Sequence, residues 1–458
     1  MFPLKASDVK KVQLGNGLTV IGVEYHKLPL AHITVMVKRG SERDPVGKEG
    51  LADLTAEMVT LGTTGRDSQQ LALEMEQWGA RYSANSGWDA SYVEVMGLSK
   101  AFPTLMDLVG DMLMRPTFPQ EEMQQSQQRR ISSLIQQRDQ AEVIADEIIA
   151  QRLLEGTPYA HPTYGFVASL RGLSVEDPRS FYRRLYAPHD TVLLVIGDLQ
   201  PEEIAHRAES HLGGWKAEGE DVDKAPAVTS HTGRRIIVVN RPDLTQSQIR
   251  VGLLGIRRKD KDYVPFKVMN YIFGGGGFSS RLMRRIRAEK GYTYSITSTF
   301  QAGQIAGPFV TSTFTPTATT VPVIEEILTV MKEFIIEGAL IQELEEAKQF
   351  LKGSYPLKLE TLGQMAGEIL LLELYGIPID YLSAYPQAIK EVTLEQVNTL
   401  ASAYLQPDAL TIVVVGRAEV FVERLRNWGE VEVIEYSEMT KGDLPPSTCT
   451  LASTTCAS

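Results

Sequence analysis

Cysteine, basic charge and long apolar runs are all scarce in this sequence of 458 residues. The two cysteines, Cys449 and Cys456, lie in a Ser/Thr-rich tail, where they neither cross-link a core nor show the spacing of a zinc site. The net charge of -11 suits neither nucleic acid nor an anionic membrane, although local basic clusters such as residues 281–290 are exceptions. No window approaches the roughly 18 uncharged apolar residues of a membrane-spanning helix. We therefore predict no nucleic-acid and no membrane partner.

The first residues, MFPLKASDVKK, show no sign of a secretory signal, because they contain neither an apolar core nor a small-residue cleavage site. The sequence as written therefore predicts a cytoplasmic protein. A periplasmic location stays open, since the chain could begin after a processing point.

Two segments of the chain recur at a nearly constant offset. The strand-like segment 31–37 has a counterpart at 247–253, 216 residues later. The segment 186–197, which has a Tyr, a Pro and an apolar strand ending in Gly, has a counterpart at 404–416, at an offset of 218 to 219. Two matches in the same order indicate duplication of a unit of about 200 residues. The alternative is that any two α/β domains share such strands.

Each half is predicted to be an α+β domain, with helices laid on a mainly antiparallel β-sheet. Strands flank the Asn16-Gly17 turn signal near the N-terminus, and helical periodicity follows in both halves. The predicted boundaries are residues 1–215 for the N-terminal domain, 216–232 for a linker, 233–438 for the C-terminal domain and 439–458 for a disordered tail.

The stretch GLADLTAEMVTLGT, residues 50–63, has apolar residues at helical spacing and two carboxylates beside them. Asp53 and Glu57 are four residues apart, so both face the same side of the predicted helix and can share a ligand. A lone pair of carboxylates would bind at best a weak, hard cation, because zinc prefers His and Cys.

The sequence from RGSERDP (39–45) through this helix resembles the pitrilysin family of zinc peptidases, which includes the mitochondrial processing peptidases. Those enzymes carry H-x-x-E-H, in which two His bind zinc and the Glu activates water. The resemblance places Asp53 and Glu57 at the His positions and Ala56 at the catalytic Glu. The third zinc ligand of the family falls on Leu134, and a further carboxylate falls on Gln127. We expect no metal in this chain.

No other catalytic site is evident from the sequence. Seven histidines are present, but His206 and His211 are five residues apart and point away from each other on a helix. The sequence contains no G-x-S-x-G elbow, Walker loop or Rossmann fingerprint.

In the second half, Gly274, Gly275, Gly276 and Gly277 precede a helical segment and a strand-like YTYSITSTF. A glycine run is typical of a flexible loop, and Phe278 stands where a nucleotide-binding loop needs Lys. The segment resembles the C-terminal half of the pitrilysin family, whose Arg and Tyr seven residues apart fall on Arg287 and Tyr294. The resemblance implies that the Tyr hydroxyl bonds the oxyanion, that the Arg holds the substrate backbone and that the glycines handle substrate.

The segment GARYSANSGWDASYVEV, residues 79–95, is similar to the strand on which the family binds substrate. Ser83 replaces the usual Asn of an Asn-Ala pair, and Ala84 is kept. A peptide is therefore expected to pair along this sheet edge.

The zinc-site residues of the family are missing from the first half, whereas the Arg/Tyr pair of the second half is present. The resemblance therefore implies a non-catalytic subunit of a heterodimeric zinc peptidase, which would enclose a peptide cleft together with a zinc-bearing homologous subunit. One alternative is a structural or peptide-binding protein of the same fold with no role in proteolysis. The other is a peptidase with a metal refitted to Asp53 and Glu57.

Overall fold

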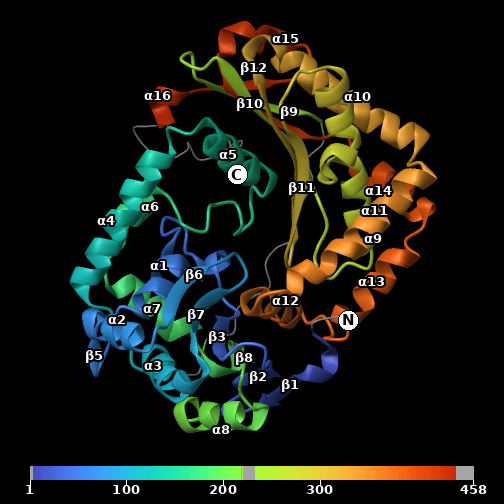
Figure 1. The fold of residues 1–458 in the computed structure, drawn as a ribbon. Coiled ribbons are helices and arrows are strands. Elements are labelled where there is room, and N and C mark those ends of the chain that lie inside the picture. Colours follow the sequence, from blue (N-terminus) through green and yellow to red (C-terminus); the bar gives the residue numbers. More distant parts are fainter. Residues whose placement is uncertain (1–3, 218, 220–232, 440–458) are drawn as a thin grey trace, which may run out of the picture.

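The computed structural model describes residues 4–217, 219 and 233–439, and it contains two six-stranded sheets, one in each half (Figure 1). The N-terminal sheet has the order β1 (Val9–Gln13), β2 (Thr19–Glu24), β8 (Thr191–Gly197), β3 (Leu30–Val37), β7 (Ser91–Leu98) and β6 (Arg81–Ser86). The C-terminal sheet has the order β14 (Val431–Glu435), β9 (Arg235–Asn240), β13 (Thr411–Gly416), β10 (Gln246–Leu254), β12 (Ala306–Pro316) and β11 (Ile296–Ala302).

Five strands follow the same order in both sheets, β2-β8-β3-β7-β6 and β9-β13-β10-β12-β11, which confirms the duplication. The sixth strand differs, because β1 is antiparallel to β2 and β14 is parallel to β9. The repeated segments form β3 and β10, and in each sheet the strand pairs with its repeated neighbour, β8 or β13. Most pairings are antiparallel, as predicted, while β2 with β8 and β9 with both β13 and β14 are parallel. The edge strands β6 and β11 also occupy matching positions, each bonded only to one neighbour.

Helices surround both sheets and connect the strands. In the first half they are α1 (Leu51–Met58), α2 (Ser68–Gln77), α3 (Phe102–Met114), α4 (Gln120–Gln137), α5 (Ala141–Leu153), α6 (Val167–Gly172), α7 (Glu176–Leu185) and α8 (Pro201–Leu212). In the second half they are α9 (Tyr263–Asn270), α10 (Thr320–Glu337), α11 (Ile341–Ser354), α12 (Leu362–Leu374), α13 (Tyr381–Glu391), α14 (Leu394–Tyr404), α15 (Val422–Arg426) and α16 (Tyr436–Met439). A small hairpin joins β4 (Gly62–Thr63) to β5 (Arg66–Asp67).

Each half contributes one helix to the sheet of the other half. The apolar face of α5 packs on strands β9, β10 and β13 of the C-terminal sheet. In return, α12 packs on β3 and β8 of the N-terminal sheet. Figure 1 shows α5, in teal, beside the yellow-green strands of the second half. This exchange ties the halves together through buried apolar surface.

Polar contacts reinforce the exchange. Arg250 on β10 is almost fully buried beneath α5, and its Nε lies 2.5 Å from Oδ1 of Asp146. On the other side, Glu373 of α12 accepts from Lys11 and Lys38 at 2.7 and 3.2 Å. A Cβ at position 252 would lie 2.7 Å from the Ile149 side chain, so this glycine lets α5 approach β10 closely.

Two predicted segments fall mostly beyond this description. Of the linker 216–232 the structure describes residues 216, 217 and 219, and of the tail 439–458 it describes residue 439. Within the described ranges, no helix combines the length and the apolar character needed to cross a bilayer.

Candidate functional site

Helix α1 begins where the loop that ends at Gly50 packs closely against the loop at Tyr164 and Gly165. Gly50 has a φ of 92°, and the carboxylate of Asp44 accepts from the backbone N–H groups of Gly50 and Ala52, both at 2.7 Å. These bonds satisfy donors that a helix N-terminus leaves free. Burial raises the pKa of Asp44 well above its usual range, against the lowering effect of those two hydrogen bonds. The first turn of α1 is thereby fixed, and with it the positions of Asp53 and Glu57.

The guanidinium of Arg130, on α4, lies between the two carboxylates of α1. Its Nε and Nη2 donate to Oε2 of Glu57 at 3.0 and 2.7 Å, and Nη1 donates to Oδ2 of Asp53. Arg129 and Ser126 donate to the other oxygen of Glu57 at 2.8 and 2.9 Å. Sequence reasoning about ligand positions did not single out Arg130.

The charges of this cluster stabilise one another. Burial would raise the pKa of Glu57, but the charge and hydrogen bonds of Arg130, with those of Ser126 and Arg129, outweigh it and lower that pKa. Burial opposes the charge of Arg130 as well, and the two carboxylates raise its pKa. The second oxygen of Asp53 accepts from the Ser86 backbone N–H at 2.7 Å. The cluster therefore connects α1, α4 and the last residue of β6.

The other positions of the family's zinc site contain no ligand. Ala56 is fully buried, and Leu134 packs in the core with 8% of its surface exposed. Gln127 points away and donates to the carbonyl oxygens of Leu170 and Leu173.

This donor set does not fit a zinc ion. Zinc needs three or four His, Cys or carboxylate ligands, whereas here two carboxylates are bonded to a cation that would repel a metal. Among the residues that the structure describes, no three His, Cys, Asp or Glu side chains group closely enough to hold a metal. We derive no catalytic step through zinc in this chain.

Arg287 and Tyr294 lie together at the surface of the second half. The Arg287 guanidinium carbon is 4.4 Å from the centre of the Tyr294 ring and 4.6 Å from that of Phe278. Both rings are 72% exposed. Within the described part of the chain, no ion pair or side-chain hydrogen bond engages Arg287, so its N–H groups are available to a ligand.

The glycine run forms a packed turn, which differs from the open loop that its composition suggests. A Cβ on Gly274 would lie 2.5 Å from Oγ of Ser298, and one on Gly275 would lie 2.7 Å from Nδ2 of Asn270. Gly277 has a φ of 57°. The turn runs from a helical turn at Tyr271–Gly275 into Gly277–Ser279 and brings Phe278 beside Arg287.

Ser83 and Ala84 lie on β6, the edge strand of the N-terminal sheet. Ser83 is exposed and Ala84 is half-buried, in the alternation typical of an edge strand with one covered face. Because β6 pairs only with β7, its outer backbone groups can accept an added strand.

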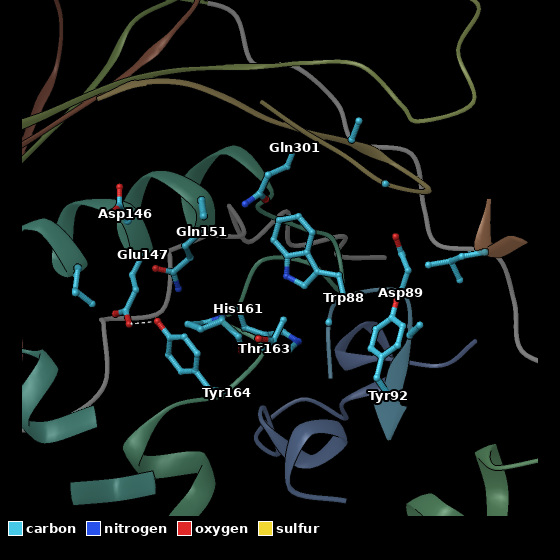
Figure 2. A pocket seen from close by; sticks show the side chains of 18 of the residues that line it. Trp88, Asp89, Tyr92, Asp146, Glu147, Gln151, His161, Thr163, Tyr164 and Gln301 are labelled. Atoms are coloured by element: carbon cyan, nitrogen blue, oxygen red, sulfur yellow. Dashed lines mark hydrogen bonds between the residues drawn. The ribbon is translucent and has the colours of Figure 1, made fainter. Parts of the chain in front are cut away.

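A cavity of about 700 Å³ lies where the two edge strands end (Figure 2). Residues 87–90, which follow β6, form one wall, and residues 301–303, at the end of β11, form another. Side chains of α5 and of the loop 161–164 complete it. The cavity therefore adjoins the end of β6.

The cavity walls combine aromatic rings with carboxylates. Tyr164 donates to Glu147 at 2.7 Å (Figure 2). Behind the wall, the Tyr159 ring packs edge-on against Trp88 with ring centres 5.6 Å apart. Asp89 is 5% exposed and accepts from the Tyr159 and Tyr375 hydroxyls at 2.6 and 2.8 Å. Such a mixture of apolar surface and few fixed polar groups is typical of ligand pockets. Sequence reasoning missed this cavity, because its walls come from separate segments.

Comparisons with known proteins agree with this picture. The family model described as Insulinase (Peptidase family M16) matches residues 20–165, and the model described as Peptidase M16 inactive domain matches residues 172–351. These matches confirm the family resemblance drawn from the sequence.

Related proteins match over almost their whole length. The chain is 24% identical over 417 residues to the non-peptidase homolog YmxG of Helicobacter pylori, covering 90% of this chain and 95% of that protein. It is 21% identical over 406 residues to the uncharacterized zinc protease YmxG of Bacillus subtilis, covering 88% and 98%. The crystal structure of a peptidase M16 inactive domain from Pseudomonas fluorescens matches with a TM-score of 0.83 and 26% identity, covering 89% of this chain and 97% of that one.

Proposed function

The chain belongs to peptidase family M16 as a member of its non-catalytic type, and on this premise we propose that it is a subunit of a heterodimeric zinc metalloendopeptidase. It binds peptides and completes the active site of a zinc-bearing homologous subunit, which supplies the metal chemistry. The chain is inactive alone, because it has no side chain at position 56 that can take a proton and no ligand set for zinc.

The observation that carries this proposal is the state of Arg287. Most guanidinium groups of the chain are engaged by carboxylates, whereas that of Arg287 is flanked by two exposed rings and offers its N–H groups outward. The rings restrict the side chain, so less entropy is lost when it binds a peptide backbone. The exposed Tyr294 beside it has a hydroxyl that can donate to a developing oxyanion.

The edge strand β6 and the adjoining cavity support a role in peptide binding. Ser83 and Ala84 offer a strand edge, and the cavity provides space for side chains beyond it. The packed turn at Gly274–Gly277 contributes by holding Phe278 against Arg287.

Peptide cleavage by the purified chain, alone and mixed with a zinc-bearing homologue from the same organism, tests the proposal, with bound metal measured in each sample. We expect the chain alone to contain no metal and to cleave no peptide, and we expect the mixed sample to be more active than the homologue alone. Arg287→Ala should lower kcat/KM of the assembled pair about tenfold or more without dissociating it. Arg284→Ala is the matched control, because Arg284 is paired with Glu343. Unchanged kcat/KM in the Arg287 variant complex would refute the role.

A second function, peptide binding without proteolysis, is favoured by one observation. The edge strand and the cavity are complete within a single chain, so binding needs no partner. Peptide binding by the chain alone, together with silence in the mixed sample, would support it. The third alternative, a peptidase with metal at Asp53 and Glu57, predicts chelator-sensitive cleavage by the chain alone, and Arg130 argues against it.

A further inference from the structure

A second cavity, of about 400 Å³, lies in the C-terminal half, and it shares no lining residue with the first. It is bounded by the loop 258–262, the first turn of α9, Ile377 and one side of α13. Figure 1 shows α9 and α13 on the same side of the molecule, and the two helices are in contact. The loop is held in place by a hydrogen bond of 3.0 Å from the Arg258 N–H to the Gly303 carbonyl.

Arg258 lines this cavity with a buried guanidinium, since the residue is only 5% exposed. The guanidinium carbon lies 4.1 Å from the centre of the Tyr263 ring and 5.0 Å from that of the Tyr381 ring. Ring faces compensate part of the charge, but they accept no in-plane N–H hydrogen bond. Among the residues that the structure describes, Nε of Arg258 has no hydrogen-bond partner.

The cavity has an excess of cations without carboxylate partners. In the described residues, no ion pair involves Arg258, Lys259 or Lys261, which all line it. The two acidic residues at its edge are engaged elsewhere: Asp260 bonds Arg257 at 2.9 Å, and Glu391 accepts from Gln387 at 2.7 Å.

The neighbouring Lys267 lies in the same excess of positive charge. Its Nζ lies 4.8 Å from the centre of the Tyr385 ring. Burial lowers the pKa of Lys267 to about 7, and the charges of Lys358 and Arg258 contribute to that shift, against Glu368. Buried cations that form no ion pair are costly, so an external anion would stabilise this region.

We infer that this cavity binds a small organic carboxylate, with the carboxylate on Arg258 and an aromatic or aliphatic body against the apolar wall. That wall consists of Val264, Pro265, Ile377, Ala388 and Val392. A planar carboxylate matches the fork of a guanidinium. The lining holds three cations and two carboxylates, so its excess of one positive charge matches a carboxylate monoanion better than a phosphate dianion. This site does not depend on the proposed role in proteolysis.

Binding of hippurate to the full chain tests this inference, with its neutral amide, hippuramide, as the matched probe. Titration calorimetry should show hippurate binding at least about tenfold more tightly than hippuramide, because only the carboxylate forms charge-assisted hydrogen bonds. Inorganic phosphate, titrated in the same way, should bind more weakly than hippurate.

Variants locate the site. Arg258→Met should remove the preference for hippurate, and the double variant Lys259→Gln/Lys261→Gln, at the cavity edge, should weaken hippurate binding about threefold while the fold is kept. Arg426→Gln is the control, since Arg426 pairs with Glu423 on α15 and neither residue lines the cavity. Equal binding of the two probes, no measurable binding of hippurate, or undiminished preference in the Arg258 variant would each overturn the inference. If Arg258→Met fails to fold, the double variant decides.

Discussion

Arg130 donates two hydrogen bonds, of 3.0 and 2.7 Å, to a single oxygen of Glu57, on the helix where the related peptidases bind zinc. With Asp53 on its other side, the guanidinium stands between two carboxylates, at the positions where the family resemblance places two histidines. Two anions therefore surround a side-chain cation where the resemblance implies two neutral ligands around a metal. These contacts join α1 to α4.

Replacing Arg130 by Gln should destabilise the protein by about 1–3 kcal/mol, because two partly buried carboxylates lose their counter-ion. The side chains of Arg130, Asp53 and Glu57 are 17%, 14% and 23% exposed. Urea unfolding at pH 7 measures the change in the free energy of unfolding. Arg129→Gln is the control, since Arg129 is 56% exposed and its loss should cost less than about 1 kcal/mol. Equal losses in both variants would contradict the central place of Arg130.

Buried Glu42 should make stability fall as the pH rises from about 4.5 to 7. Burial raises the pKa of Glu42 from 4.5 to about 7, against the charge of Arg43. Between these values the folded state holds a proton that the unfolded state has released, so stability decreases with pH, by at most about 3 kcal/mol.

Urea unfolding of the wild type and of Glu42→Gln at pH 5 and pH 7 measures this contribution. The variant should lack that part of the decrease and be the more stable protein at pH 7. The buried Asp44 stays in both proteins, and because the charge of Glu42 helps to raise the pKa of Asp44, the difference between them measures Glu42 together with this coupling. Parallel pH profiles would show that Glu42 is ionised throughout.

The contact between the two halves at Asp89 should be measurable in the free energy of unfolding. Tyr375→Phe removes the 2.8 Å hydrogen bond from α12 to Asp89 and leaves that of Tyr159 in place. The expected loss is about 1–2 kcal/mol, because the acceptor is a buried carboxylate. Tyr294→Phe is the control, since that hydroxyl is exposed. A double variant with Tyr159→Phe should lose more than the sum if the two bonds share one buried charge.

The sequence predicts the strands and the duplication well, because apolar strands and their offset depend on local pattern. It does not predict the exchange of α5 and α12. Helical periodicity identifies a buried face such as that of Ile144 and Ile148, but not the sheet that covers it. Gly274 shows the same limit, because composition suggests an open loop, whereas its close contact with Ser298 arises only in the folded chain.

Arg130 escaped prediction for a related reason. A zinc motif identifies only the ligand positions, and the third of these positions is occupied by Leu134. Arg130 lies one helical turn earlier, and its long side chain reaches back to the carboxylates. The sequence could have predicted a cation here on electrostatic grounds. Asp53 and Glu57 stand where the family resemblance places histidines, and a partly buried pair of negative charges requires a nearby positive charge.

Rebuilding the zinc site should succeed only if Arg130 is also removed. The substitutions Asp53→His, Glu57→His and Leu134→Glu restore the three zinc ligands that the family resemblance implies, and a fourth, Ala56→Glu, restores the residue that activates water. With Arg130 kept, its charge remains among the new ligands and repels the metal. With Arg130→Gln added, zinc affinity, measured by competition with a chromophoric chelator, should rise at least about tenfold. Two like charges at short range near a protein surface repel each other by a few kcal/mol, and about 1.4 kcal/mol corresponds to a factor of ten in affinity.

The matched control adds Arg129→Gln to the same four substitutions. Arg129 reaches only the outer oxygen of Glu57 and is mostly exposed, so its removal should change zinc affinity less than about threefold. Equal affinities with and without Arg130 would mean that the guanidinium swings out of the site when histidines return. In that case, the missing ligands alone, and not the arginine, would account for the absence of zinc binding that we expect.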